Sequence, residues 1–203
     1  MNSHRGVVTL SLLPMIAREL FSKRTLARVP EPEVMNEATQ VSAYAKAGIA
    51  DGMMTTGYAF HAARASQVIQ GCSRVLDLGC GPGIQLCDVA ELNPHIEFRG
   101  VDLSEEMLEH ARTHAERREL RNVTFQHGDM TRLDEFASGS VDGVISTMTL
   151  HHLPSYADLE RCFAQIARVR KADGAIYLAD FIRLKSARSV DFFLDSQEAT
   201  PHS

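Results

Sequence analysis

One eleven-residue stretch constrains the fold more than any other part of the chain. Residues 73–83 read S-R-V-L-D-L-G-C-G-P-G, so a short apolar run leads directly into closely spaced glycines. A run without polar alternation is typical of a strand buried on both faces of a parallel sheet. Glycines this dense permit a tight turn and let the backbone approach a ligand closely. Because the residues after Gly83 have a helical pattern, we predict a strand, a glycine loop and a helix whose N-terminus faces the bound group.

The spacing of the glycines separates two classes of nucleotide site. A dinucleotide fingerprint, G-x-G-x-x-G, would need a third glycine at position 84, which is Ile84. The pattern is instead D-x-G-x-G-x-G, with Asp77 two residues before Gly79. A second acid, Asp102, ends the next apolar strand 23 residues after Gly79. There a carboxylate can accept hydrogen bonds from both hydroxyls of a ribose.

The stretch L-D-L-G-C-G-P-G resembles motif I of the class I S-adenosylmethionine-dependent methyltransferases, and the resemblance extends over roughly residues 36–182. It implies S-adenosylmethionine as cofactor and methyl transfer as the activity. It also implies a lid helix at 36–47, packing of Met107 against the adenine, and a hydrogen bond from the adenine amine to Asp129. The cofactor-binding residues that it implies are Tyr44, Asp77, Gly79, Cys80, Gly81, Asp102, Leu103, Met107, Asp129, Met130, Thr147 and His152.

Strand and helix patterns alternate from residue 73 onward, which indicates a doubly wound parallel sheet. The strands are expected at 74–78, 96–101, 123–127, 142–146 and 175–179, the last after a turn at Asp173-Gly174. With the resemblance, the prediction is an α/β, Rossmann-like sheet in the order 3-2-1-4-5 with an N-terminal helical extension. We expect an N-terminal helical arm and linker over 1–35 and the S-adenosylmethionine-binding domain over 36–203.

The C-terminus departs from the family pattern. Members usually continue with antiparallel strands six and seven, whereas Ile182–Ser203 read as one helix and a tail. Ala175–Ala179 would then form an exposed apolar edge, which is a surface prone to pairing. The pattern leaves open a shortened domain or an edge covered by another subunit. We expect a homo-oligomer formed through this edge or through the N-terminal arm.

Composition limits the partners. The chain has 203 residues, a net charge of −5 and a pI near 6.0, which argues against electrostatic binding of nucleic acid or anionic membranes. Four cysteines without a C-x-x-C pair suit a reducing cytosol, and no apolar run reaches the length of a membrane span. Residues 1–30 contain five basic residues and one acid. This composition is typical of a basic amphipathic helix, which is either solvated or docks on an acidic partner.

Two histidines are the candidates for proton transfer. Methyl transfer from a sulfonium is an in-line displacement in which the enzyme chiefly supplies proximity and orientation, and a base is needed only if the acceptor arrives protonated. His151 and His152 follow the predicted fourth strand in S-T-M-T-L-H-H-L-P. In the alternative interpretation, one of these two histidines caps the loop and the other packs on the cofactor. We predict no metal, because His110 and His114, four apart on a helix, lack a third ligand.

The acceptor is predicted to be a small organic molecule, methylated on oxygen, nitrogen or carbon. The sequence S-T-M-T after the fourth strand lacks the [N/D/S]-P-P-[Y/F] tetrapeptide of DNA amino-methylating enzymes and the paired glutamates of arginine methyltransferases. Met53, Met54 and Tyr58 suit an apolar or aromatic substrate. Two alternatives stay open: an aminopropyltransferase-like enzyme, and a non-catalytic S-adenosylmethionine-binding or scaffold protein.

Overall fold

The computed structural model describes residues 14, 16–23, 26–27, 55–181, 185–188 and 190–191. The chain divides into two units, Pro30–Asp180 in one and Met1–Val29 with Phe181–Ser203 in the other. Within the latter unit, residues 16–21 are helical, as expected for an N-terminal extension. The predicted lid helix at 36–47, with Tyr44, and the loop with Met53 and Met54 lie outside the described residues. The predicted domain boundary at residue 35 stays a prediction.

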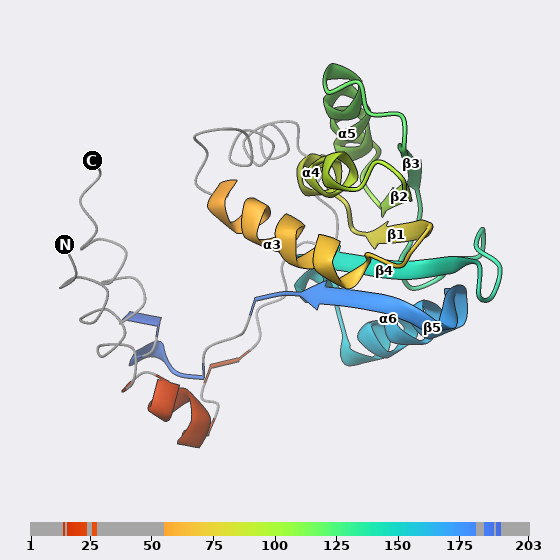
Figure 1. Ribbon diagram of the computed structural model, residues 1–203. Helices are drawn as coiled ribbons and strands as arrows, with labels where there is room; N and C mark the ends of the chain where they lie inside the picture. The colour runs from red at the N-terminus through yellow and green to blue at the C-terminus, as the bar shows by residue number, and fades with distance from the viewer. Residues whose placement is uncertain are drawn as a thin grey trace, which may run out of the picture. The chain divides into compact units, whose positions relative to one another are not determined.

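The larger unit is built on a parallel sheet whose described strands lie in the order β3-β2-β1-β4-β5 (Figure 1). This confirms the predicted α/β fold and strand order. The strands are β1 (Arg74–Leu78), β2 (Glu97–Asp102), β3 (Val123–His127), β4 (Val141–Thr147) and β5 (Arg170–Ala179).

Helices cover both faces of the sheet, as the alternating pattern predicts. One apolar cluster joins α3, α4 and α5 to the sheet, and a second cluster joins α6 to the other face (Figure 1). The helices are α3 (Thr55–Val68), α4 (Ile84–Leu92), α5 (Glu105–Arg117) and α6 (Tyr156–Val169), with a short 3-10 helix, η1 (Leu150–His152).

Local sequence explains where α5 begins. The Ser104 hydroxyl accepts a hydrogen bond from the backbone N–H of Met107, and Glu105 and Glu106 occupy the first turn, where the helix dipole favours acids. The cap fixes the chain direction immediately after β2. It therefore places the end of β2 and the first turn of α5 beside the glycine loop.

The start of β5 differs from the prediction. The expected turn at Asp173-Gly174 is a bulge within the strand, because Arg170 pairs with Val141 while Ala175 already pairs with Gly143. The Arg170 guanidinium donates to the carbonyl oxygens of three residues of this bulge, Lys171, Ala172 and Gly174. A bulge disrupts the hydrogen-bonding ladder at an edge strand and so limits pairing with another chain there.

The connection from β3 to β4 is also unusual. In this fully described stretch, residues 128–140 form turns and no helix. Its apolar side chains, Met130, Leu133 and Phe136, are buried against the α6 side of the sheet. Part of that face near β2 and β3 consequently stays accessible.

Candidate functional site

The three glycines of the loop are required for different reasons. All have positive φ, +70° at Gly79, +52° at Gly81 and +71° at Gly83, which side chains rarely tolerate. A Cβ on Gly79 would lie 1.9 Å from Thr149 Cγ2, and one on Gly83 would lie 2.7 Å from Ala111 Cβ. A Cβ on Gly81 would meet nothing within 4 Å. Gly79 and Gly83 thus permit close packing, whereas Gly81 borders open space.

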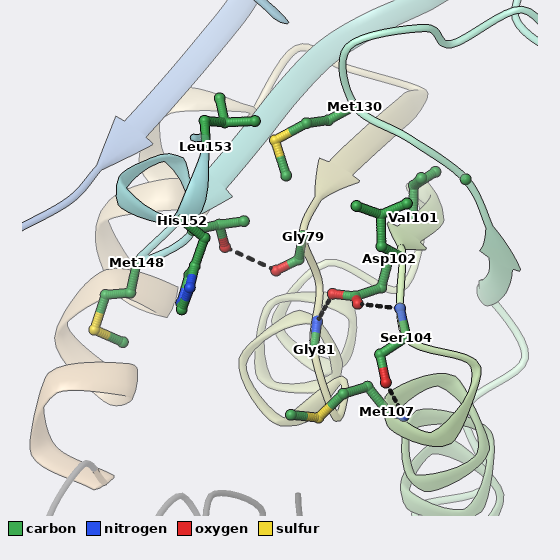
Figure 2. Close-up of a pocket in the computed structure, with 13 residues that line it drawn as sticks. Gly79, Gly81, Val101, Asp102, Ser104, Met107, Met130, Met148, His152 and Leu153 are labelled. Carbon is green, nitrogen blue, oxygen red and sulfur yellow. Dashed lines mark hydrogen bonds between the residues drawn. The ribbon is translucent and has the colours of Figure 1, made fainter. Parts of the chain in front are cut away.

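That open space is a pocket at the carboxyl ends of β1, β2 and β4 (Figure 2). Its volume, which includes space open to solvent, is about 680 Å³. Seven predicted cofactor-binding residues line it: Gly79, Gly81, Asp102, Leu103, Met107, Met130 and His152. Six further lining residues were not predicted as site residues: Val101, Ser104, Gly128, Met148, Thr149 and Leu153.

Asp102 occupies the centre of one wall. Its Oδ2 accepts the N–H of Gly81 at 2.8 Å and its Oδ1 accepts the N–H of Ser104 at 2.9 Å (Figure 2). Burial raises the pKa of Asp102, although these hydrogen bonds and the nearby His152 act in the opposite direction. Each carboxylate oxygen has a second lone pair, so the group can still accept hydrogen bonds from a ligand hydroxyl.

A second, smaller cavity adjoins the first at Gly79 and Gly81 and contains two buried acceptors. Asp77 is 6% exposed and Gln85 is 9% exposed. The Gln85 Oε1 atom has no hydrogen-bond partner, and within the described ranges no group donates to the Asp77 carboxylate. Burial, and then the charge of Asp102, raise the pKa of Asp77 to about 8. A buried acceptor without a donor is unfavourable, so this cavity is suited to a ligand that donates hydrogen bonds.

Two other predicted cofactor-binding residues, Cys80 and Thr147, line this cavity, as does Tyr58. Cys80 is buried, and that burial raises its thiol pKa well above the ordinary value. A buried thiol of this kind is inert, so any contact of this residue with a ligand is through its backbone. Gln85 was missed by the sequence analysis, although a polar residue in the otherwise apolar first turn of α4 is a usable signal.

Hydrogen bonds join the tips of β1 and β4. Ser146 Oγ donates to the carbonyl of Leu78 at 2.8 Å, and Thr149 Oγ1 lies 3.0 Å from the carbonyl oxygen of Gly79. Met148 between them has φ +52°, which is uncommon for a residue with a side chain. Backbone strain of this kind is often found at functional sites. The two strand tips therefore form one continuous wall of the site.

The two predicted catalytic histidines differ in their surroundings. His151 Nδ1 lies 2.6 Å from Asp180 Oδ1, and the His151 backbone N–H donates to Asp180 Oδ2 at 3.0 Å. The His152 ring lies beside that of His151, with the centroids 4.2 Å apart, and it lines the pocket. His151 is not among the lining residues. Asp180 was not predicted as a site residue, although an acid directly after the last predicted strand is a signal for one.

Asp129 does not line either cavity, although its neighbours Gly128 and Met130 line the larger one. Its Oδ1 accepts both the backbone N–H and the hydroxyl of Thr131 at 2.7 Å. Burial acts to raise its pKa, but the hydrogen bonds from Thr131 and Arg132 lower it overall. Its contact with an adenine amine stays a prediction.

Over the described ranges, no group of three His, Cys, Asp or Glu side chains is arranged to hold a metal ion. In the same part of the chain, no helix has both the length and the apolar character needed to cross a membrane.

The similarity of this chain to known proteins covers about half of its length. Residues 75–174, about half of the chain, match the family model of a methyltransferase domain. The uncharacterized methyltransferase YcgJ of Bacillus subtilis is 34% identical over 108 residues, which cover 53% of this chain and 40% of that protein. Its solved structure aligns with a TM-score of 0.53 and 29% identity, covering 60% of this chain and 50% of that one.

Two relatives have named acceptors. A malonyl-(acyl-carrier protein) O-methyltransferase of Legionella pneumophila is 36% identical over 103 residues, 51% of this chain and 34% of that protein. An arsenite methyltransferase of Aquipseudomonas alcaligenes is 34% identical over 124 residues, 57% of this chain and 34% of that protein. The chain spans half or less of the length of each of these relatives.

Proposed function

Because the chain carries a class I S-adenosylmethionine-dependent methyltransferase domain, we propose that it binds S-adenosylmethionine at the glycine loop and methylates a small organic acceptor. One observation carries the proposal. The glycine loop separates a pocket containing a carboxylate suited to a ribose, Asp102, from a cavity with two buried acceptors suited to an ammonium group, Asp77 and Gln85. A nucleoside joined to an amino acid offers hydroxyls on one side and an ammonium on the other.

In the larger pocket, we assign the ribose to Asp102 and the adenine to the apolar residues around it. Asp102 is already held by the N–H groups of Gly81 and Ser104, so it can receive a hydroxyl without reorganising. Leu103, Met107 and Met130 line the same pocket, and methionine adapts its shape to a flat ring. On sequence position, Asp129 is the candidate for the adenine amine, and Tyr44 is the candidate for the lid.

In the smaller cavity, Asp77 and Gln85 would hold the ammonium group. An ammonium offers three donors and no acceptor, which matches two acceptors to which no described residue donates. Its positive charge would also favour the ionised form of Asp77, whose pKa burial raises to about 8. Thr147 and the backbone of Cys80 border the same space.

The chemistry supplied by the bound sulfonium is an activated methyl group, which passes to a lone pair of the acceptor as the carbon–sulfur bond breaks. The protein residues orient the two partners and remove a proton where the acceptor carries one. We propose His151 for that role, with Asp180 as its positioning residue. His151 Nδ1 lies 2.6 Å from Asp180 Oδ1, and a hydrogen bond donated by Nδ1–H to this oxygen would fix the tautomer in which Nε2 accepts a proton.

His152 is the second candidate. It lines the pocket, and its ring lies against that of His151. By contacting the bound cofactor and packing against His151, His152 would set the distance between the base and the methyl group. The acceptors named for the relatives differ from one another, so we assign only a small-molecule class to the acceptor of this chain.

The first test is calorimetric titration of the full chain with S-adenosylhomocysteine. We expect saturable binding by the natural sequence and none by Gly81→Arg, because the added side chain would fill the pocket. The matched control is Gly139→Arg, since Gly139 also has positive φ and open space around its Cβ position but lies away from the pocket. Folded natural protein without binding, or equal loss in both variants, would refute the proposal. A binding-competent chain would then be screened for acceptors with labelled S-adenosylmethionine.

A further inference from the structure

A second large pocket lies at the opposite end of the sheet, where β1, β2 and β3 begin. Its volume, which includes space open to solvent, is about 1080 Å³. The corresponding volume of the candidate cofactor pocket is about 680 Å³. Arg74, Arg99 and Arg121 line it, together with Glu97 and Glu135. None of these residues belongs to the candidate methyltransferase site.

The pocket exists because one part of the sheet is left uncovered. The strand register places Leu76, Arg99 and Thr124 side by side on three neighbouring strands, hence on one face. The β3–β4 connection has no helix to cover this face, and its Phe136 reaches only as far as Arg99. Arg99 and Thr124 are therefore exposed.

The guanidinium groups in this pocket have no polar partner among the described residues. Among the described residues, none of the three arginines makes an ion pair or a hydrogen bond through its side chain. Arg99 is nevertheless held in place, because its Cζ lies 5.7 Å from the centroid of the Phe136 ring. The Phe136 loop is itself fixed by Arg168, which donates to the carbonyls of Phe136 and Leu133 at 2.7 Å.

The three arginines of the pocket lie in a unit whose net charge is negative. The chain carries −5; residues 1–29 contribute +4 and 181–203 contribute zero, which leaves −9 for residues 30–180. Four described arginines of this unit, Arg112, Arg118, Arg132 and Arg161, form ion pairs with carboxylates, whereas the three arginines of the pocket form none with the described residues. Three guanidiniums against two carboxylates give the pocket a local excess of positive charge, which favours an anionic ligand.

The other lining groups narrow the class of anion. Glu97 and Glu135 are hydrogen-bond acceptors in the same pocket, and Ser140 Oγ is buried without a hydrogen-bond partner. Carboxylates beside guanidiniums repel a bare polyanion but accept hydrogen bonds from hydroxyl groups. We infer that this pocket binds a small phosphorylated ligand that also carries hydroxyl groups, such as a sugar phosphate.

The test is calorimetric titration of the full chain with ribose 5-phosphate at low ionic strength. We expect saturable binding to one site, with inorganic phosphate and ribose each at least about tenfold weaker because each satisfies only part of the pocket. Arg99→Gln and Arg121→Gln should each weaken binding about tenfold or more. The control is Arg117→Gln, which removes an exposed arginine on α5 outside the pocket and should leave binding unchanged.

Several outcomes would overturn the inference. These are the absence of saturable binding, an equal loss in Arg117→Gln, or inorganic phosphate binding as tightly as ribose 5-phosphate. Competition by S-adenosylhomocysteine would place the ligand in the candidate cofactor pocket and would overturn it as well. If Arg99→Gln lowers the melting temperature by loss of its contact with Phe136, Arg121→Gln decides, since the Arg121 side chain makes no hydrogen bond, ion pair or ring contact with the described residues.

Discussion

A Cβ atom on Gly79 would lie 1.9 Å from Thr149 Cγ2, so the tips of β1 and β4 approach each other as closely as a glycine allows. We expect Gly79→Ala to lower the free energy of unfolding by more than about 1 kcal/mol, from this clash and from the positive φ. Thr149→Ser removes Cγ2 but keeps the hydroxyl that contacts the Gly79 carbonyl, so it should recover part of the loss. Urea denaturation of the two single variants and the double variant measures the coupling, and simple additivity would contradict the contact.

Asp102 is expected to contribute to affinity for the cofactor. Asp102→Ala should weaken S-adenosylhomocysteine binding by about 1–3 kcal/mol, the usual loss for a charge-assisted hydrogen-bonding group. Calorimetry measures this change, with Asp134→Ala, an exposed acid outside the pocket, as the control. Unchanged affinity in Asp102→Ala would refute the ribose assignment.

Gln85 is expected to recognise only one part of the cofactor. Gln85→Leu removes the buried Oε1, which has no hydrogen-bond partner among the described residues, so it should not destabilise the fold by loss of a hydrogen bond. It should weaken S-adenosylhomocysteine binding about tenfold while leaving methylthioadenosine, which lacks the amino-acid group, unaffected. An equal loss for both ligands would show that Gln85 acts on the loop and not on the ammonium.

Asp77 should make stability depend on pH. Its pKa is about 8 in the folded protein, against an ordinary value of 3.8 for an aspartate, so the folded state holds the proton more tightly. The contribution of Asp77 to the free energy of unfolding should therefore fall as pH rises from about 4 to about 8, by up to about 1.4 kcal/mol per pH unit, and level off above. The free energy of unfolding, measured by chemical denaturation, should differ less between pH 6 and pH 9 for Asp77→Asn than for the natural sequence. Equal differences would mean that Asp77 titrates normally.

Asp180 should set the tautomer of His151. In nitrogen NMR of the labelled chain, we expect the His151 Nδ1–H form in the natural sequence and a mixture in Asp180→Asn, because the acceptor for that proton is weakened. Once an acceptor is known, the same variant should lower kcat about 10²-fold or more and shift its pH profile, with S-adenosylhomocysteine affinity retained. A pH profile identical to that of the natural sequence would leave Asp180 a purely structural role.

The sequence by itself determined the type and order of the strands and helices. The apolar run before Gly79, the cap at Ser104 and the alternation of strand and helix patterns are local properties, and they gave the parallel sheet and most element boundaries. The glycine spacing also predicted which strand tips would carry the pocket. These inferences succeed because backbone preference and hydrophobic periodicity act over only a few neighbouring residues.

Only the tertiary structure decided which distant residues meet. The partnership of His151 with Asp180 spans 29 residues, and the shared cavity of Asp77 and Gln85 depends on how α4 leaves the loop. The expected turn at Asp173-Gly174 became a bulge because the edge strand could pair with β4 on both sides of it. Such contacts are set by how strands and helices pack in three dimensions, and no local pattern in the sequence encodes them.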